Sequence, residues 1–342
     1  MSFELKNNYK TYVEYLEDAG CKLQPYLIET IKNSRLSFEE AKHADVDKYL
    51  YDLITKYSKN PGKMHRPLTL IASYLACGGS VDELDSVAVI ACSIEHFQTA
   101  ALIHDDIADG GKLRRGKPCM HITEGEGLAI NAGDFGLAMT VGNLITNMKS
   151  SKYNEKKILD IVEKLIYMEY MTIEGQAMDL GWARDNRFDI SPDDYLCMAT
   201  KKSAYYSAMI PCVIGAICAD TGADVLDALN DFGLKVGLAF QIQDDVLNLV
   251  ENKNSKKVKD FRSDITEGKR TLIISYALSS CDDENKKRLL EILESGQTDD
   301  KVLEEAVNIL ETCGAILKSI DSAKRLIDEA KIILSKKLDD SM

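Results

Sequence analysis

The sequence predicts an all-α protein whose 342 residues form a single domain. Only 6 prolines and 21 glycines interrupt the chain, and long stretches repeat apolar residues at the i, i+3, i+4 spacing of a helix face. No segment has the composition of an interdomain linker or a low-complexity tail. With 45% hydrophobic residues the chain is long enough to bury a sizeable core, so we expect one helical bundle over residues 1–342.

The helix boundaries follow from the breakers. Residues 1–57 have the pattern of helices with charged faces, and the run Ser58–Gly62 ends them. A helix over about 66–76 and a longer one over about 81–108 each end at a glycine pair. The later helices are expected over 128–148, 154–181, 192–220, 223–252, 270–280, 284–294 and 300–338, with a long polar connection at 252–267.

Composition excludes several classes of protein. A net charge of −13 argues against a nucleic-acid binder, because a phosphate backbone requires a basic face. The nine cysteines include no C-x-x-C pair, and several lie in apolar runs, which favours free thiols in a reduced, cytoplasmic protein. The N-terminus lacks the apolar core of a signal peptide, and no uncharged apolar run approaches 18 residues, so we expect no membrane span.

One acidic phrase occurs twice, first at 100–109 and again in the second half of the chain. On a helix Asp105 and Asp109 share a face one turn apart, and so do Asp244 and Asn248. Acidic runs near helix ends are usually solvated, but the first copy stands at a helix C-terminus, where the macrodipole disfavours negative charge. Stacked carboxylates repel without a cation, so the two faces predict a site for Mg²⁺ and a metal-bound phosphate.

Basic residues accompany the acidic phrases. Arg114 and Arg115 stand in a glycine-flanked loop just after the first phrase, and guanidinium groups match phosphate oxygens bidentately. Lys63 and Arg66 lie three apart at a helix start, where free N–H groups also favour an anion. His96 precedes the first phrase on the same helix, and taken alone it would more often be a packed histidine than a ligand. Cation and anion sites adjacent in sequence indicate diphosphate chemistry.

Together these motifs resemble those of the trans-isoprenyl diphosphate synthases, the family of the farnesyl and geranylgeranyl diphosphate synthases, over nearly the whole chain. The matching segments, in the family's order and spacing, are Gly62-Lys63-x-x-Arg66-Pro67, His96, His104-Asp105-Asp106-x-x-Asp109, Leu113-Arg114-Arg115-Gly116-x-Pro118, Ala129-Ile130-Asn131-Ala132-Gly133-Asp134, Gly175-Gln176-x-x-Asp179, Lys202-Ser203, Phe240-Gln241-x-x-Asp244-Asp245-x-x-Asn248 and Asp264-Ile265-x-x-Gly268-Lys269. Three positions depart from the family's pattern: Asn248, Ser203 and the segment Gly110–Lys112.

The resemblance implies an isoprenoid synthase-type helical bundle around a central apolar cavity. It also implies a Mg²⁺-dependent prenyltransferase that condenses an allylic diphosphate (dimethylallyl, geranyl or farnesyl) with isopentenyl diphosphate and releases pyrophosphate. Ionisation of the allylic substrate would place negative charge on pyrophosphate, which metals and lysines stabilise, and an apolar cavity would keep the cation from water.

The resemblance assigns roles to individual residues. Three Mg²⁺ ions would be ligated by Asp105, Asp109 and Asp244, supported by Asp106, Asp179, Asp245 and Asn248. The allylic diphosphate would be bound by Arg114, Lys202, Lys259 and Lys269. Isopentenyl diphosphate would be bound by Lys63, Arg66, His96 and Arg115. The catalytic set would be Lys202, Ser203 and Gln241, of which the last two stabilise or orient the cation.

The product length depends, by the same resemblance, on the residues before the first aspartate motif. Ala100 and Ala101 are small and leave room beyond a fifteen-carbon product, and Phe97, about 12 Å along the helix axis from Asp105, is the next candidate floor. We therefore expect geranylgeranyl diphosphate or a somewhat longer product. Phe97 is otherwise an ordinary core residue.

Two other functions share some of these features. A class I terpene cyclase has a similar fold and an aspartate motif but has no use for a second diphosphate site, which here would be formed by Lys63, Arg66, His96 and Arg115. A regulatory subunit of a heteromeric prenyl synthase tends to lose the aspartate motifs, and both are present here. The resemblance also implies a homodimer, for which the apolar segment 130–148 is the candidate interface.

Overall fold

The computed structural model describes residues 2–6, 8–36, 43–60, 62–148, 153–250, 262–296 and 298–336. It is 80% helical, with one short two-stranded hairpin among these residues, which confirms the prediction of an all-α protein. The chain divides into two compact units, one of residues 1–169 and 210–230, the other of residues 170–209 and 231–336. The single domain over residues 1–342 stays a prediction.

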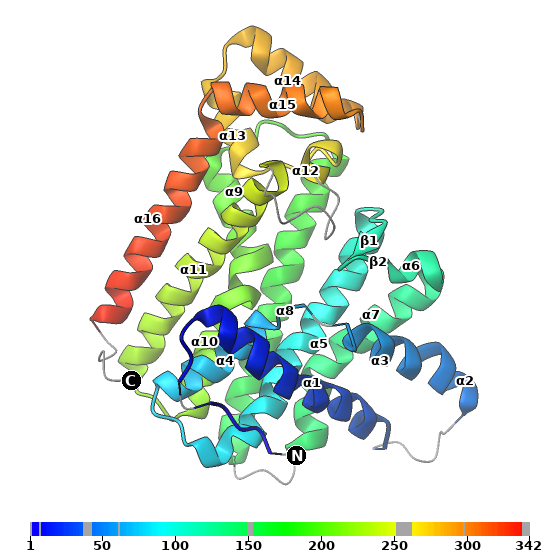
Figure 1. Ribbon diagram of the computed structural model, residues 1–342, viewed down its shortest axis with the longest axis vertical. Helices are drawn as coiled ribbons and strands as arrows, with labels where there is room; N and C mark the ends of the chain where they lie inside the picture. Colours follow the sequence, from blue (N-terminus) through cyan, green and yellow to red (C-terminus); the bar gives the residue numbers. More distant parts are fainter. Residues whose placement is uncertain are drawn as a thin grey trace. The chain divides into compact units, whose positions relative to one another are not determined.

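The first unit contains the N-terminal helices and the first acidic phrase (Figure 1). Its elements are α1 (Tyr12–Leu36), α2 (Ala44–Val46), η2 (Asp47–Tyr51), α3 (Asp52–Ser58), α4 (His65–Ala76), η3 (Val81–Glu83), α5 (Leu84–Ala108), β1 (Leu113–Arg114), β2 (Lys117–Pro118), α6 (Met120–Thr123), α7 (Glu126–Asn147), α10 (Ile210–Cys218), and the first parts of α8 (Glu155–Arg184) and α11 (Ala223–Leu249).

Helices α5 and α7 pack along each other in this unit, and glycine makes the close approach possible. A Cβ atom on Gly136 of α7 would lie 3.0 Å from the Cβ of Ala100 and 3.3 Å from the backbone oxygen of His96. Two turns further along α7, the amide of Asn143 donates to the Val89 backbone oxygen over 2.7 Å and to Ser93 Oγ over 2.9 Å. These contacts fix the rotation of α5 about its axis, and hence the directions of its polar side chains.

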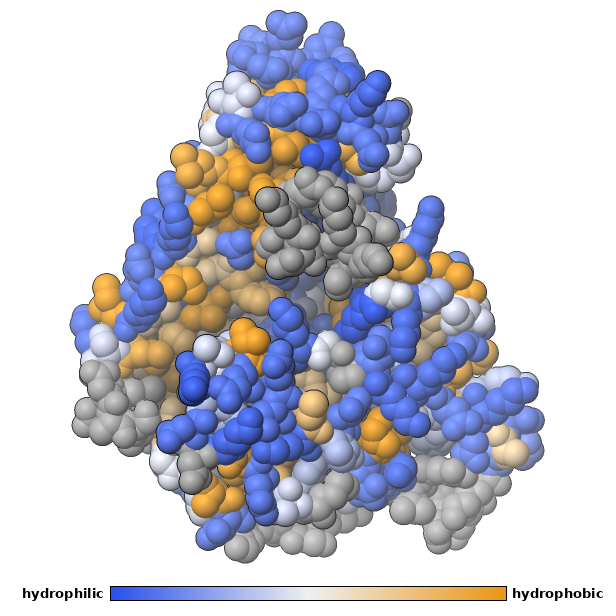
Figure 2. All heavy atoms as spheres, in the orientation of Figure 1, coloured by the Kyte–Doolittle hydropathy of each residue, from blue (hydrophilic) through white to orange (hydrophobic). Residues whose placement is uncertain are grey.

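The second unit carries the second acidic phrase. It contains the later parts of α8 and α11 together with α9 (Pro192–Ala199), η4 (Thr200–Met209), α12 (Ser263–Thr266), α13 (Leu272–Ser280), α14 (Asp283–Ser295), α15 (Asp300–Thr312) and α16 (Ala315–Ser335). The α14–α15 pair is joined by a bidentate bond from Arg288 to Glu305, with N···O distances of 2.8 and 2.7 Å. Its outer surface is largely hydrophilic (Figure 2).

A ten-residue π-helix, η4, interrupts the helix expected over 192–220. Glycines hold it from two sides: a Cβ on Gly175 of α8 would lie 2.2 Å from the backbone N of Lys202, and one on Gly237 of α11 would lie 2.7 Å from the Cα of Ala204. A π-helix re-aims side chains relative to an α-helix and is often found at functional sites. Here it carries Lys202 and Ser203.

Two further differences from the sequence prediction have local causes. The helix expected over 300–338 is two helices, because Gly314 adopts a left-handed conformation with φ of 74° and ends the first. The basic loop forms the hairpin β1–β2, whose turn residues Arg115 and Gly116 both have positive φ, at 52° and 74°. Positive φ at both turn positions is typical of a tight type I′ hairpin turn. Most of the polar connection at 252–267 lies outside the described residues.

Two helical segments of the described chain have the length and composition to cross a membrane, 81–108 and 126–147. The most apolar window of the first is 78% buried within the protein, and that of the second is 44% buried. Buried core helices satisfy the same length and composition criteria, so the expected absence of a membrane span stays a prediction.

Candidate active site

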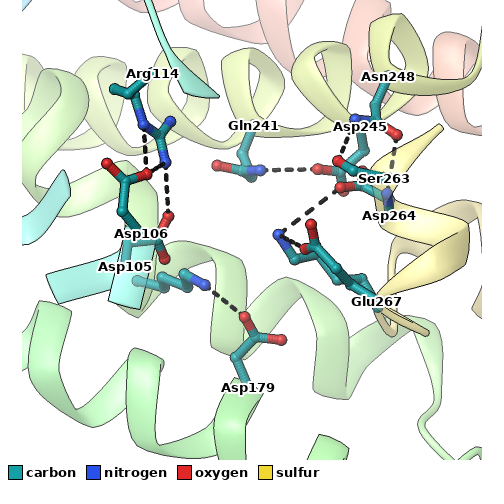
Figure 3. Close-up of polar contacts among 12 residues, drawn as sticks. Asp105, Asp106, Arg114, Asp179, Gln241, Asp245, Asn248, Ser263, Asp264 and Glu267 are labelled. Carbon is teal, nitrogen blue, oxygen red and sulfur yellow. Dashed lines mark hydrogen bonds and ion pairs between the residues drawn. The ribbon is translucent and has the colours of Figure 1, made fainter. Parts of the chain in front are cut away.

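The first acidic cluster lies at the end of α5. Asp106 is buried there, and Arg114 of the hairpin reaches it: Nε donates to Asp106 Oδ1 over 2.7 Å, and Nη2 lies 2.5 Å from the same oxygen. Nη2 also lies 3.5 Å from Asp105 Oδ2 (Figure 3). Asp109 caps the helix. The guanidinium thus offsets two carboxylates at a helix end that is already negative.

The oxygens of this cluster fit a hard divalent cation. The second oxygen of Asp106, Oδ2, is buried and has no hydrogen-bond partner among the described residues. Carboxylates one helical turn apart are donors that Mg²⁺ prefers. Within the same described ranges, no group of three or more His, Cys, Asp or Glu side chains stands close enough to enclose an ion. Asp244 belongs to the second unit and is described with it.

A second cationic cluster surrounds the neighbouring arginine. Arg115 Nη1 donates to the backbone oxygen of Asn60 over 2.8 Å, and Nη2 lies 4.0 Å from Glu95 Oε1. A Cβ on Gly62 would lie 3.1 Å from Arg115 Nη2, so the segment before α4 and the hairpin turn are in contact. Burial raises the pKa of Glu95, and the charges of Arg115 and Arg66 oppose that shift. Glu95 therefore lies beside Arg115 and within the electrostatic range of Arg66.

Lys63 and Arg66 flank the start of α4. Lys63 is exposed, and Met64 begins the helix in a left-handed conformation with φ of 50° and no side-chain cap. Between them, burial together with the charges of Arg66 and Lys63 lowers the pKa of His65 to about 3. Two positive charges therefore act on the start of this helix, as an anion site requires.

Two buried polar residues on α5, His96 and Gln98, differ in their hydrogen bonding. His96 is fully buried, its Nε2 lies 2.9 Å from Thr30 Oγ1 of α1, and burial lowers its pKa to about 3, so it is neutral. It brings no positive charge to a diphosphate. Gln98 is also buried, but its Oε1 has no hydrogen-bond partner in the described part of the chain. The sequence signal that was missed is the i, i+3 spacing of Glu95 and Gln98, which places both on one face.

In the second unit a chain of hydrogen bonds surrounds the second acidic phrase. Ser203 Oγ donates to Gln241 Oε1 over 2.6 Å, and Gln241 Nε2 donates to Asp245 Oδ1 over 2.8 Å (Figure 3). The Tyr195 hydroxyl donates to Asp245 Oδ2 over 2.6 Å. Asp245 is buried, and its pKa is raised to about 7 by burial and then by the nearby Asp264. Asp244, one residue earlier on α11, is exposed.

Asn248 connects α11 to the segment around α12. Its Oδ1 accepts the Asp264 N–H over 3.1 Å, and its Nδ2 donates to Ser263 Oγ over 3.1 Å (Figure 3). Lys269 follows, with Nζ 2.7 Å from Glu267 Oε2 and 3.8 Å from Asp264 Oδ1. An aspartate at position 248 has no amide N–H to donate to Ser263, so the asparagine suits this bracing role. Lys259 lies outside the described residues.

Lys202 reaches the acidic residue of the Gly175-Gln176-x-x-Asp179 motif. Its Nζ lies 2.5 Å from Asp179 Oδ2, and the missing side chain at Gly175 allows the two helices to approach. Gly175 therefore lies against the backbone of Lys202, and Asp179 binds the side chain of the same lysine.

The three residues expected to limit product length differ in environment. Phe97 and Ala100 are fully buried, and the Cβ of Ala100 points toward Gly136 of α7. Ala101, rotated by about 100° around the helix, is only half-buried. The two adjacent alanines are therefore not equivalent.

Comparisons with known proteins identify relatives of this chain. The sequence matches the family described as polyprenyl synthetase over residues 47–310. A short chain isoprenyl diphosphate synthase of Methanocaldococcus jannaschii is 36% identical over 80% of this chain and 80% of its own. A geranylgeranyl diphosphate synthase of Saccharolobus solfataricus is 32% identical over 79% of this chain and 78% of its own. The crystal structure of a geranylgeranyl pyrophosphate synthetase from Pyrococcus horikoshii covers 93% of both chains, with a TM-score of 0.78 and 28% identity.

Proposed function

The chain belongs to the polyprenyl synthetase family, whose members elongate prenyl chains, and from this premise we propose that it condenses an allylic diphosphate with isopentenyl diphosphate to give geranylgeranyl diphosphate. The main observation behind this proposal is that two adjacent arginines contact different groups. Arg114 contacts the carboxylates of α5, whereas Arg115 contacts Glu95 and the segment before α4. An enzyme that holds one metal-bound and one metal-free diphosphate needs two such cationic positions.

The allylic diphosphate is assigned to the aspartate side. Asp105, Asp109 and Asp244 would hold Mg²⁺, three ions per active site, and Asp106 would orient Arg114. When bound, Mg²⁺ neutralises charge on the departing pyrophosphate. Lys202, fixed by Asp179, and Lys269 would add positive charge at the same diphosphate.

Isopentenyl diphosphate is assigned to the second cationic cluster, with Lys63, Arg66 and Arg115 as its charged ligands. Because His96 is neutral and bonded to Thr30, we assign it to fixing α5 against α1 and give the uncharged ligand position to Gln98. The Gln98 amide can donate its N–H groups to phosphate oxygens, which are acceptors.

The allylic cation is assigned to Ser203 and Gln241. The Ser203 hydroxyl donates to Gln241, so its oxygen lone pairs remain available to a cation, and Asp245 fixes the amide. The proton lost after carbon–carbon bond formation would go to pyrophosphate, because this scheme needs no side-chain base.

The proposed product has twenty carbons or somewhat more. Several relatives are named geranylgeranyl diphosphate synthases, and others, at 29% and 33% identity, are named geranylfarnesyl diphosphate synthases. The half-buried Ala101 supports a channel left open beyond fifteen carbons. The comparisons give no support to a terpene cyclase or a regulatory subunit.

We also propose a cytoplasmic homodimer. The first unit exposes large aliphatic side chains on α7 and α8: Ile130 (45% exposed), Ile145 (59%) and Leu159 (65%). A second copy that covers them would remove this apolar surface from water.

The function is tested by mass analysis of the products formed from isopentenyl diphosphate and each of dimethylallyl, geranyl and farnesyl diphosphates. Each reaction is run once with Mg²⁺ and once with a chelator. We expect a twenty-carbon diphosphate that disappears on chelation. Arg114→Lys and Arg115→Lys form a matched pair: the first should raise KM for the allylic substrate, the second KM for isopentenyl diphosphate. A hydrocarbon formed without isopentenyl diphosphate would instead identify a cyclase.

A further inference from the structure

Tyr57, near the end of α3, has a buried hydroxyl without a partner. Its oxygen is shielded from solvent, and no atom of the described chain forms a hydrogen bond with it. Two other buried tyrosines of the same unit are satisfied, whereas Tyr153 is not: Tyr15 donates to the Leu68 backbone oxygen over 2.7 Å, and Tyr74 donates to that of Ser80 over 2.9 Å. A buried, unsatisfied hydroxyl destabilises the free protein unless something else binds it.

The surroundings of this hydroxyl are those of an anion site. The Arg115 guanidinium carbon lies 6.0 Å from the centre of the Tyr57 ring, and Arg115 is itself anchored to the backbone of Asn60, three residues beyond Tyr57. Burial raises the pKa of Tyr57 well above its usual range, although the positive charge of Arg115 opposes this shift. The phenol therefore remains protonated and can only offer its O–H to an acceptor brought by a ligand.

We propose that the Tyr57 hydroxyl donates a hydrogen bond to a phosphate oxygen of isopentenyl diphosphate, alongside Arg115. This assignment rests on the proposed function and deepens it, because no sequence motif includes Tyr57. The isopentenyl side is favoured over the allylic side because the ring packs against Arg115 and because the chain leads directly from Tyr57 through Asn60 to Lys63.

Removal of the hydroxyl should stabilise the free protein and weaken the binding of isopentenyl diphosphate. In Tyr57→Phe the unsatisfied polar atom disappears from the free protein, so its Tm should rise by ~1–3 °C. The variant also loses one charge-assisted hydrogen bond to substrate, so KM for isopentenyl diphosphate should rise on the order of tenfold to a hundredfold. KM for the allylic substrate should not change. Tyr74→Phe is the matched control, since it breaks a hydrogen bond that is made: its Tm should fall and neither KM should change.

The experiment measures both KM values and the Tm of the full chain with and without isopentenyl diphosphate. The expected result is a more stable free Tyr57→Phe protein with a smaller ligand-induced rise in Tm than wild type. The assignment would be overturned by any of three results: KM values of Tyr57→Phe equal to those of wild type, a change confined to the KM for the allylic substrate, or a lower Tm of the free variant. A wild-type protein that neither turns over nor responds to isopentenyl diphosphate would overturn the proposed function as well.

Discussion

Replacement of Ala101 by phenylalanine is expected to shorten the product from twenty to fifteen carbons, whereas the same change at Ala100 is expected to damage the fold. The difference follows from their surroundings. A single Cβ on Gly136 would already lie 3.0 Å from the Cβ of Ala100, closer than the roughly 3.5–4.0 Å of ordinary carbon contacts. A benzyl group at Ala100 therefore has no room between α5 and α7. Ala101 is half-buried and points away from that contact.

The magnitudes follow from these environments. Overpacking at position 100 should cost about 1–3 kcal/mol of unfolding free energy, or ~2–4 °C in Tm for a chain of this size. At position 101 the ring should occupy the space of the last isoprene unit, so kcat/KM with farnesyl diphosphate as starter should fall at least about tenfold, equivalent to roughly 1.4 kcal/mol of lost transition-state stabilisation.

The assay is mass analysis of products from geranyl and farnesyl diphosphates, together with thermal unfolding of both variants. Ala101→Phe should retain activity with geranyl diphosphate and the Tm of wild type. The reasoning would be refuted if Ala101→Phe still made the twenty-carbon product, or if Ala100→Phe kept the wild-type Tm while shortening the product.

Three other outcomes are expected. Gly175→Ala should lower kcat about tenfold or more, because its Cβ would lie 2.2 Å from the backbone N of Lys202, whereas Gly181→Ala in the same helix meets no atom within 4 Å and should be silent; equal kcat values would contradict this. The pKa of His96 is about 3 in the folded state, below the unfolded value of about 6.5, so the unfolded chain binds the extra proton and stability falls as pH drops through this window. Urea unfolding should show about 2 kcal/mol of this loss between pH 6.5 and 5 in wild type but not in His96→Gln, and parallel profiles would refute it. Ile145→Glu should shift the protein to monomer in light scattering, and an unchanged mass would count against the proposed interface.

The helices and the acidic phrases were predictable because both are local features. The spacing of apolar residues and the glycine pair that follows predicted a helix over about 81–108, and the observed helix is Leu84–Ala108. The break at Gly314 was missed because the apolar pattern continues at the same period on both sides of it. The π-helix over Thr200–Met209 was not predictable, because it is held by glycines from two other helices.

The sequence by itself determined the chemistry: carboxylates one turn apart, a pair of arginines and separate lysines in the order of a prenyl diphosphate synthase. Only the tertiary structure decided the surroundings of each side chain: Asp245 is buried and accepts a hydrogen bond from Tyr195, whereas its neighbour Asp244 is exposed. The physical reason is that successive side chains on a helix point about 100° apart, so neighbours in sequence face different surroundings. The rotation that selects between them is set by contacts with other helices, such as that of Gly136 with α5.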